Sequence, residues 1–261
     1  MHPVMLASGA VATGAMVALW ALSVRLRDAS VVDVFWGPGF AAIAWTSLLV
    51  AGPSGRGLLL ASLATAWGLR LGVHLARRRR GHGEDRRYGA MRAARGSRFA
   101  LISFFTVFLL QAALMWTVSL PIQAGAALGS GEPLGTLDAA GVAVFAVGLW
   151  FEAAADAQLA RFLADPGSRG RVMQTGLWRY TRHPNYFGDS LVWWGLGLAS
   201  LATGAWWALL GPALMTVLLL RVSGVTLLEQ TIGERRPGYA EYASRTSAFF
   251  PWPSRRAARP S

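Results

Sequence analysis

The residues best suited to chemistry lie in Gly176–Asp189, a stretch that reads GLWRYTRHPNYFGD and runs directly into an apolar segment. Polar groups beside a hydrophobic helix are costly to desolvate, so they usually serve a function. Arg179 and Arg182 suit phosphate oxygens, because a guanidinium group presents a planar fork of N–H donors. The stretch therefore predicts a site for a phosphorylated ligand.

The same stretch predicts a helix that carries amide and carboxylate groups. Pro184 is typical of a helix start. Asn185 and Asp189 are four residues apart, so they would share one helix face. Such a face can hold several hydroxyl or amide groups of a bound cofactor. Two aromatic rings of the stretch join this predicted cofactor site, His183 and Tyr186.

A pair of carboxylates lies earlier in the chain. Glu152 and Asp156 are four residues apart inside an apolar run, and Arg161 follows. Two carboxylates on one face of a membrane helix are costly unless they are paired. Structural pairing with arginine and contact with a cofactor both fit this pattern, and the two roles can coexist.

A third group of polar residues lies in the N-terminal half. Arg70, His74 and Arg77 share a helix face by their spacing of four and three residues. Arginines near a helix end commonly snorkel to the membrane surface, which explains His74 less well. Asp33, followed by Trp36, begins another apolar run, either as a first-turn carboxylate favoured by the helix dipole or as a functional group.

The C-terminal segment is the last polar region. Tyr239, Tyr242 and Arg245 could clamp a large polar ligand. The alternative is an amphipathic segment at the membrane interface with aromatic anchors, which we favour for Phe249–Trp252.

Composition indicates what must position these residues. The 261 residues are 54% hydrophobic and 15% charged, and 12 are tryptophan, which favours a polytopic membrane protein. Cysteine is absent from the sequence, so disulfides, thiolate metal sites and cysteine nucleophiles are excluded. The spacings match no common metal-ligand pattern, and we expect no metal. Without a glycine-rich strand–helix motif, a dinucleotide would bind without a Rossmann fold.

The apolar runs predict an all-α bundle of about seven transmembrane helices in one integral membrane domain, 1–261. The Trp36–Gly39 sequence, WGPG, predicts a break inside the second helix, and Pro121 closes the fourth. The expected helices are 4–23, 31–51, 57–76, 99–120, 137–158, 187–202 and 205–226.

Charge predicts the orientation of this bundle. The net charge is +12, all basic residues are arginine, and they gather after the first, third and fifth runs and in the tail. The positive-inside rule then places the N-terminus outside and the C-terminus in the cytoplasm. We interpret the charge as facing anionic lipids rather than nucleic acid. The start lacks a basic region typical of a signal peptide.

These residues resemble the signature of the steroid 5α-reductase and sterol reductase superfamily, integral membrane enzymes that reduce double bonds with NADPH. The whole chain is similar to the bacterial branch of that superfamily, and the run RHPNYFGD is its most specific match. The matching blocks are 33–37, 70–77, 84–92, 111–121, 151–162, 176–195 and 221–251.

The resemblance implies a bacterial inner-membrane protein with NADPH bound on the cytoplasmic side. The cofactor-binding half would be about 137–253, and helices in 1–136 would complete a cavity for a lipid-like substrate that enters from the bilayer. The residues that would bind the cofactor are Arg77, Glu152, Asp156, Arg161, Arg179, Arg182, His183, Asn185, Tyr186, Asp189, Tyr239, Tyr242 and Arg245.

One departure from the family concerns the proton donor. Steroid 5α-reductases hold the substrate carbonyl with a glutamate on the second helix and a tyrosine on the third. Here His74 stands at the tyrosine position, and Asp33 or Trp36 lies near the glutamate position. We predict His74 as the proton donor, with Asp33 as its orienting partner and Trp36 near the substrate.

Two other functions remain open. Isoprenylcysteine-type membrane methyltransferases share an Arg-His-Pro-x-Tyr run and bind S-adenosylmethionine. A non-enzymatic lipid-binding or transport bundle would use its arginines for headgroups and would bind no nucleotide. The substrate (steroid, other isoprenoid or fatty-acyl compound) and the oligomeric state are not given by the sequence.

Overall fold

A computed structural model describes residues 1–131, 133–222, 225, 229 and 236–254. These residues are helical, apart from connecting loops and one isolated bridge between Thr181 and Ser247. The chain divides into two compact units. The first contains Met1–Ala139 and Leu196–Gly211, and the second contains Ala140–Gly195 and Pro212–Ser261.

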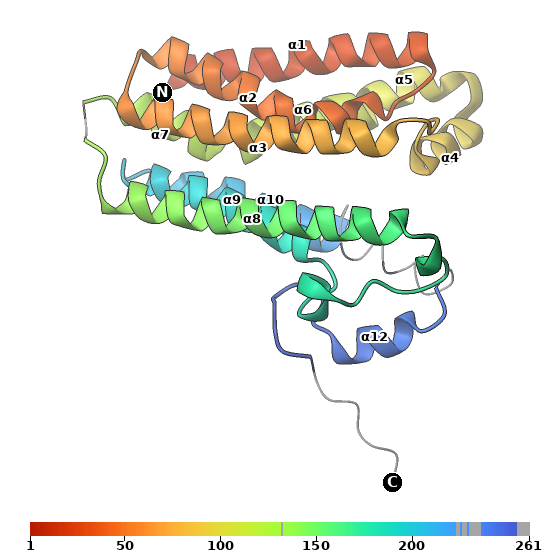
Figure 1. Ribbon diagram of the computed structural model, residues 1–261. Coiled ribbons are helices and arrows are strands. Elements are labelled where there is room, and N and C mark those ends of the chain that lie inside the picture. The colour runs from red at the N-terminus through yellow and green to blue at the C-terminus, as the bar shows by residue number, and fades with distance from the viewer. Residues whose placement is uncertain (132, 223–224, 226–228, 230–235, 255–261) are drawn as a thin grey trace. The chain divides into compact units, whose positions relative to one another are not determined.

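The first unit is built on α1, α2 and α3, which lie side by side (Figure 1). A nearly continuous helical segment follows over Arg86–Val118, and α7 then packs against α2 and α3. The α-helices are α1 His2–Leu26, α2 Val31–Ala51, α3 Gly55–Arg79, α4 Arg86–Arg95, α5 Phe99–Ser103, α6 Leu110–Val118 and α7 Leu120–Leu128. A 3-10 turn, η1 Gly96–Arg98, joins α4 to α5, and a π-helical stretch, η2 Phe104–Leu109, joins α5 to α6.

The predicted break at WGPG is wrong, because α2 runs continuously through Pro38. The glycines serve close packing instead. A methyl group built on Gly37 would lie 2.3 Å from the carbonyl oxygen of Gly68 on α3, and one built on Gly72 would lie 2.9 Å from Pro38. Small residues let two membrane helices approach at backbone distance. The motif therefore marks the crossing of α2 and α3.

Pro121 ends one helix and begins another. Helix α6 stops at Val118, and α7 carries the proline in its first turn, where a missing N–H costs little. The restart through Leu128 was not expected from the sequence. Leu120 and Ala124 of α7 pack against Ala205 and Ala208, so the new helix contributes to the core of the first unit.

A buried ion pair closes the loop end of this unit. Arg56 donates to both carboxylate oxygens of Asp138, at 2.8 and 2.9 Å, and each residue is 2% exposed. Arg56 also donates to the carbonyl of Pro133, and the N–H of Gly135 donates to Asp138. The pair thus joins the start of α3 to the first turn of α8.

The remaining helices include the long α8 and the pair α9 and α10 (Figure 1). Short 3-10 turns punctuate the loop between α8 and α9. The bounds are α8 Thr136–Ala164, η3 Pro166–Ser168, η4 Gly176–Arg179, α9 Pro184–Leu201, η5 Trp206–Leu209, α10 Leu210–Val217, η6 Leu218–Val222 and α12 Tyr239–Arg245.

Five helices of the described chain are long and apolar enough to cross a membrane, which makes this a multi-pass membrane protein. They are His2–Leu26, Val31–Ala51, Gly55–Arg79, Arg86–Val118 and Thr136–Ala164. The sixth predicted span corresponds to α9, which does not meet that measure, and the seventh to the shorter apolar stretch Trp206–Val222. Residues 223, 224 and 226 of the seventh, and the arginine-rich end 255–261, lie outside the described residues.

Candidate functional site

Two glycines bring α8 and α9 together in the second unit. A methyl group on Gly148 would lie 2.6 Å from the carbonyl oxygen of Gly188, and one on Gly188 would lie 2.4 Å from the backbone nitrogen of Glu152. No side chain larger than hydrogen fits at such distances without movement of the backbone. The crossing therefore fixes which side chains of the two helices face each other.

The crossing gathers the predicted carboxylates and amide. Glu152, Asp156 and Asp189 are 3%, 7% and 8% exposed. The Asn185 amide nitrogen donates to a carboxylate oxygen of Asp156 at 3.2 Å. Helix α9 begins at Pro184, so Asn185 and Asp189 occupy its first turns on one face. Four predicted cofactor residues thus lie at one helix crossing.

The other end of the Asn185 amide has unused hydrogen-bonding capacity. Its side-chain oxygen is buried and accepts no hydrogen bond from any described residue. Buried polar atoms are almost always hydrogen-bonded, so an exception in a folded protein needs an explanation. An acceptor in this position can receive an N–H or O–H group from a ligand.

A charged cluster lies at the start of α9. Arg182 donates to both carboxylate oxygens of Glu229, at 2.7 and 3.0 Å, and His183 Nε2 lies 3.1 Å from Glu229. Partial burial alone would raise the pKa of Glu229, but the hydrogen bonds from His183 and Arg182 outweigh it and lower that pKa to about 2. His183 is buried and its ring stacks on Tyr186 at 5.4 Å.

Arg182 also attaches the C-terminal segment. Its Nη1 donates to the carbonyls of Ala243 and Thr246, at 2.7 and 2.8 Å, and its backbone N–H donates to Ser247. With the bonds to Glu229, four of its five N–H donors contact protein acceptors. The structure thus gives Arg182 a role in holding the tail, in addition to the phosphate role that the sequence predicts.

The two tyrosines of the C-terminal segment, Tyr239 and Tyr242, are buried. Tyr242 donates to the carbonyl of Trp178 at 2.5 Å. Tyr239 is buried as well; this burial, reinforced by the negative charge of Glu229, raises its pKa to about 12. Arg245 donates to Gln174 at 2.6 Å. Tyr242 and Arg245 therefore tie the C-terminal segment to the loop that precedes α9, and the ring of Tyr239 packs edge to face against Tyr242.

Two of the arginines predicted to bind the cofactor in the second unit are exposed. Arg161 on α8 and Arg179 in η4 are exposed. The loop that carries Arg179 is tied to α8, because Leu177 N–H donates to Gln158 and the Trp178 ring nitrogen donates to the carbonyl of Ala155. Arg179 thus projects from an anchored loop, where its fork of donors can meet an anionic group.

In the first unit, Asp33 lies in the first turn of α2 and is contacted from α4. The Tyr88 hydroxyl donates to one carboxylate oxygen at 2.9 Å, and Arg87 donates to the other at 3.1 Å. Tyr88 is buried. No role was predicted for Tyr88 from the sequence, although it lies inside the matching block 84–92. The structure adds it as a hydroxyl donor next to a predicted catalytic residue.

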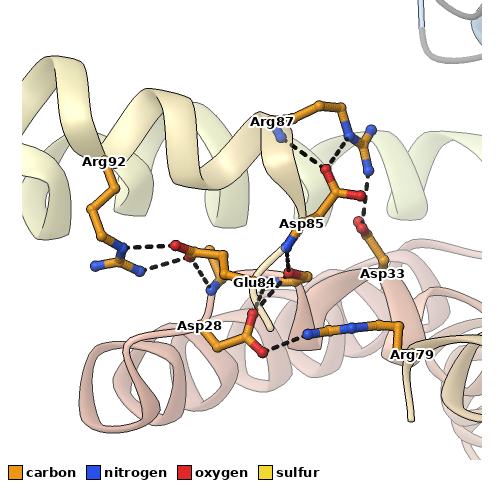
Figure 2. A network of polar contacts seen from close by, with 9 residues as sticks. Asp28, Asp33, Arg79, Glu84, Asp85, Arg87 and Arg92 are labelled. Atoms are coloured by element: carbon orange, nitrogen blue, oxygen red, sulfur yellow. Dashed lines mark hydrogen bonds and ion pairs between the residues drawn. The ribbon is translucent and has the colours of Figure 1, made fainter. Parts of the chain in front are cut away.

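Asp33 belongs to a larger network that joins the loop after α1 to the loop after α3 (Figure 2). Arg92 donates to both oxygens of Glu84, and Glu84 accepts the Ala29 N–H at 2.8 Å. The hydrogen bond from Arg92 outweighs burial and lowers the pKa of Glu84. Asp28 pairs with Arg79. These contacts hold the loops and give Arg79, Arg87 and Arg92 a structural role.

His74 is half-buried on α3, and Arg77 is exposed one turn later. Trp36 is half-buried on α2 and meets Phe40 edge to face. Within the described ranges, three or more histidine or carboxylate side chains do not gather in a group suited to a metal ion.

The helices and this polar crossing define a multi-pass α-helical membrane protein with a buried amide and carboxylate site. Residues 19–246 match the family described as "Protein of unknown function (DUF1295)", and the chain belongs to that family. It is also similar to an uncharacterised protein of Schizosaccharomyces pombe, with 26% identity over 89% of this chain and 75% of the yeast protein. No solved structure matches.

Proposed function

We propose that the protein is an NADPH-dependent reductase of an electron-poor carbon–carbon double bond in a steroid-like or other lipid substrate. The observation that carries the proposal is the buried side-chain oxygen of Asn185, which lacks a donor among the described residues and lies beside Asp156. The resemblance of RHPNYFGD to the reductase signature supports the same ligand.

The residues of the second unit fit a nicotinamide nucleotide by their chemistry. Carboxylates such as Glu152 and Asp189 accept hydrogen bonds from ribose hydroxyl groups, and the Asn185 oxygen accepts from an amide N–H. Arg179 and Arg161 are exposed and can contact phosphates. His183, Tyr186, Tyr239 and Tyr242 would shape the walls. NADPH would supply the hydride, and the protein would supply binding and orientation.

The proton donor is a second part of the proposal. His74 remains our predicted donor, with Asp33 as its orienting partner. The Tyr88 hydroxyl, which already donates to Asp33 at 2.9 Å, is a second candidate. His74→Ala should abolish turnover with NADPH binding intact, and Tyr88→Phe should do so if the tyrosine is the donor. Stopped-flow measurement of NADPH oxidation separates these two cases.

The proposal includes the finer topology: seven spans in the bacterial inner membrane, the N-terminus outside, and the cofactor site and C-terminus in the cytoplasm. The arginine-rich loops support it. Because the chain lacks cysteine, single cysteines report cleanly on sidedness. His2→Cys should react with an impermeant maleimide in intact cells, and Ser254→Cys only after lysis. The reverse pattern would overturn this topology.

Nucleotide binding is the direct test. Purified full-length protein in detergent should bind NADPH in calorimetry, and Asn185→Ala should weaken binding about tenfold, as expected for one lost hydrogen bond to a ligand. Gln123→Ala is the matched control, because Gln123 is also a buried amide but lies on α7 in the first unit. Asp189→Ala should behave like Asn185→Ala.

Unchanged affinity in Asn185→Ala and Asp189→Ala would remove this site from the proposal. A protein with no affinity for NADPH or for S-adenosylmethionine would favour the non-enzymatic lipid-binding bundle. After binding is established, a screen of lipids that contain an enone, read by NADPH oxidation, would identify the substrate class.

One observation favours a second function. The run Arg182-His183-Pro184, followed by Tyr186, is shared with isoprenylcysteine-type membrane methyltransferases, which bind S-adenosylmethionine. This supports the methyltransferase alternative. Titration of S-adenosylmethionine beside NADPH on the same preparation decides between them, because the proposed reductase should bind only NADPH.

A further inference from the structure

A groove lies in the first unit, on other helices than those of the α8–α9 crossing. It has a volume of about 490 Å³ and is formed by α1, α2 and α3 with the loop after α1. Leu19 and Leu22 line it from α1, Val34 and Pro38 from α2, and Ala76 from α3. These spacings of three and four residues place one stripe of each helix along the groove.

One end of the groove is charged. Asp28, Arg79 and Arg80 line it there, and Asp28 pairs with Arg79. The two charges of that pair compensate each other, so Arg80 gives the groove a net positive charge. Arg80 is exposed and follows the last residue of α3. The groove is therefore apolar along its length and cationic at one end.

This pattern matches an amphipathic anion. The lining helices are all long and apolar enough to span a membrane, so the apolar part of the groove lies where acyl chains are the solvent. Arginines at the end of a membrane helix meet the headgroup region, where anionic lipids attract them. The volume falls within the range of small-molecule sites.

We propose that this groove binds one acyl chain of an anionic phospholipid, with the lipid phosphate at Arg80. None of the residues that line the groove is among those proposed to bind the nucleotide. This lipid site therefore stands whether or not the protein is a reductase.

The test uses purified full-length protein in an uncharged detergent, without nucleotide. Short-chain phosphatidylglycerol and phosphatidylcholine are titrated separately, and bound lipid is counted by native mass spectrometry. Phosphatidylglycerol should bind about fivefold more tightly, the effect of one arginine near a headgroup. Arg80→Gln should remove that preference. Ala76→Trp, which fills the groove, should weaken binding of both lipids.

Matched controls keep the test specific. Arg98→Gln removes another exposed arginine, and Ala66→Trp adds the same bulk on another exposed position of α3; neither residue lines the groove. Both should bind like the wild type. Unchanged preference in Arg80→Gln, or unchanged binding in Ala76→Trp, would overturn the proposal. Equally strong competition by glycerol phosphate would show a site for free phosphate and would also overturn it.

Discussion

Carboxylates of the two units make two kinds of polar contact. In the first unit Asp28, Glu84, Asp85 and Asp138 each pair with an arginine side chain, at the surface or in the interior. In the second unit Glu229 pairs with Arg182 in the same way, whereas Asp156 accepts a hydrogen bond from the amide of Asn185. A guanidinium neutralises a carboxylate, whereas an amide does not.

The difference separates two uses of polar residues in a membrane protein. Ion pairs between loops, as in Figure 2, hold elements in place and satisfy both partners. An amide beside a carboxylate keeps an acceptor oxygen available, as the buried Asn185 oxygen shows. The ion pairs are therefore mainly structural, while the buried acceptor oxygen of Asn185 at the α8–α9 crossing is suited to a ligand.

The largest effect should come from the buried ion pair of the first unit. Arg56→Ala leaves Asp138 buried without its guanidinium, which should cost about 3–5 kcal/mol of unfolding free energy. Denaturant unfolding in detergent measures this loss. The double variant Arg56→Ala with Asp138→Ala should recover part of it. A loss below about 1 kcal/mol would show that this buried ion pair contributes little to stability, and would contradict the structural role given to such pairs.

The next effect tests the helix crossing of the second unit. Gly188→Ala puts a methyl group 2.4 Å from the Glu152 nitrogen, and such overpacking should cost about 1–3 kcal/mol. It should also weaken NADPH binding, because it moves Glu152 and Asp156 relative to α9. Gly14→Ala on α1 is the control, since a methyl group there meets open space. Unfolding and calorimetry on both variants give the two readouts.

A smaller effect depends on pH. The folded protein lowers the pKa of Glu229 from 4.5 to about 2, so this group stabilises the fold above pH 4.5 and loses that contribution as the pH falls toward 2. The side chain is 25% exposed, and solvent screens the pair, so we expect about 1 kcal/mol. Glu229→Gln should flatten the acid side of a melting-temperature profile. An identical profile in wild type and variant would contradict this.

The smallest effect should come from the exposed network. Arg87 is 47% exposed in its pair with Asp33, and exposed pairs contribute about 0–1 kcal/mol. Arg87→Ala should therefore change stability by less than about 1 kcal/mol, measured beside Arg56→Ala. If Arg87→Ala lost as much unfolding free energy as Arg56→Ala, solvent exposure would not determine how much these two ion pairs stabilise the fold.

The sequence predicted helix positions better than it predicted packing. The second predicted helix, 31–51, coincides with α2, because its apolar run is bounded by clear breaks. The WGPG motif was misinterpreted, because glycine and proline break isolated helices but also permit close crossings. Only the contact of Gly37 with Gly68 on α3 distinguishes a close crossing from a break, and this contact depends on the tertiary structure.

The candidate site shows the same limit. Asn185 and Asp189 could be placed on one helix, because their spacing is local. Tyr88 meets Asp33 across 55 residues, and Arg182 meets Glu229 across 47. Pairs this distant follow from the fold, not from periodicity. The cofactor and catalytic roles of the named residues stay predictions until nucleotide binding is measured.

The glycine contact between α2 and α3 has a consequence for biogenesis. The two helices are joined by only three residues, Gly52 to Ser54, and touch through backbone atoms. Such a hairpin can assemble in the bilayer while the rest of the polypeptide is still being synthesised. Bulky replacements at Gly37 should then reduce the yield of inserted protein in pulse-chase labelling, before any activity could be assayed.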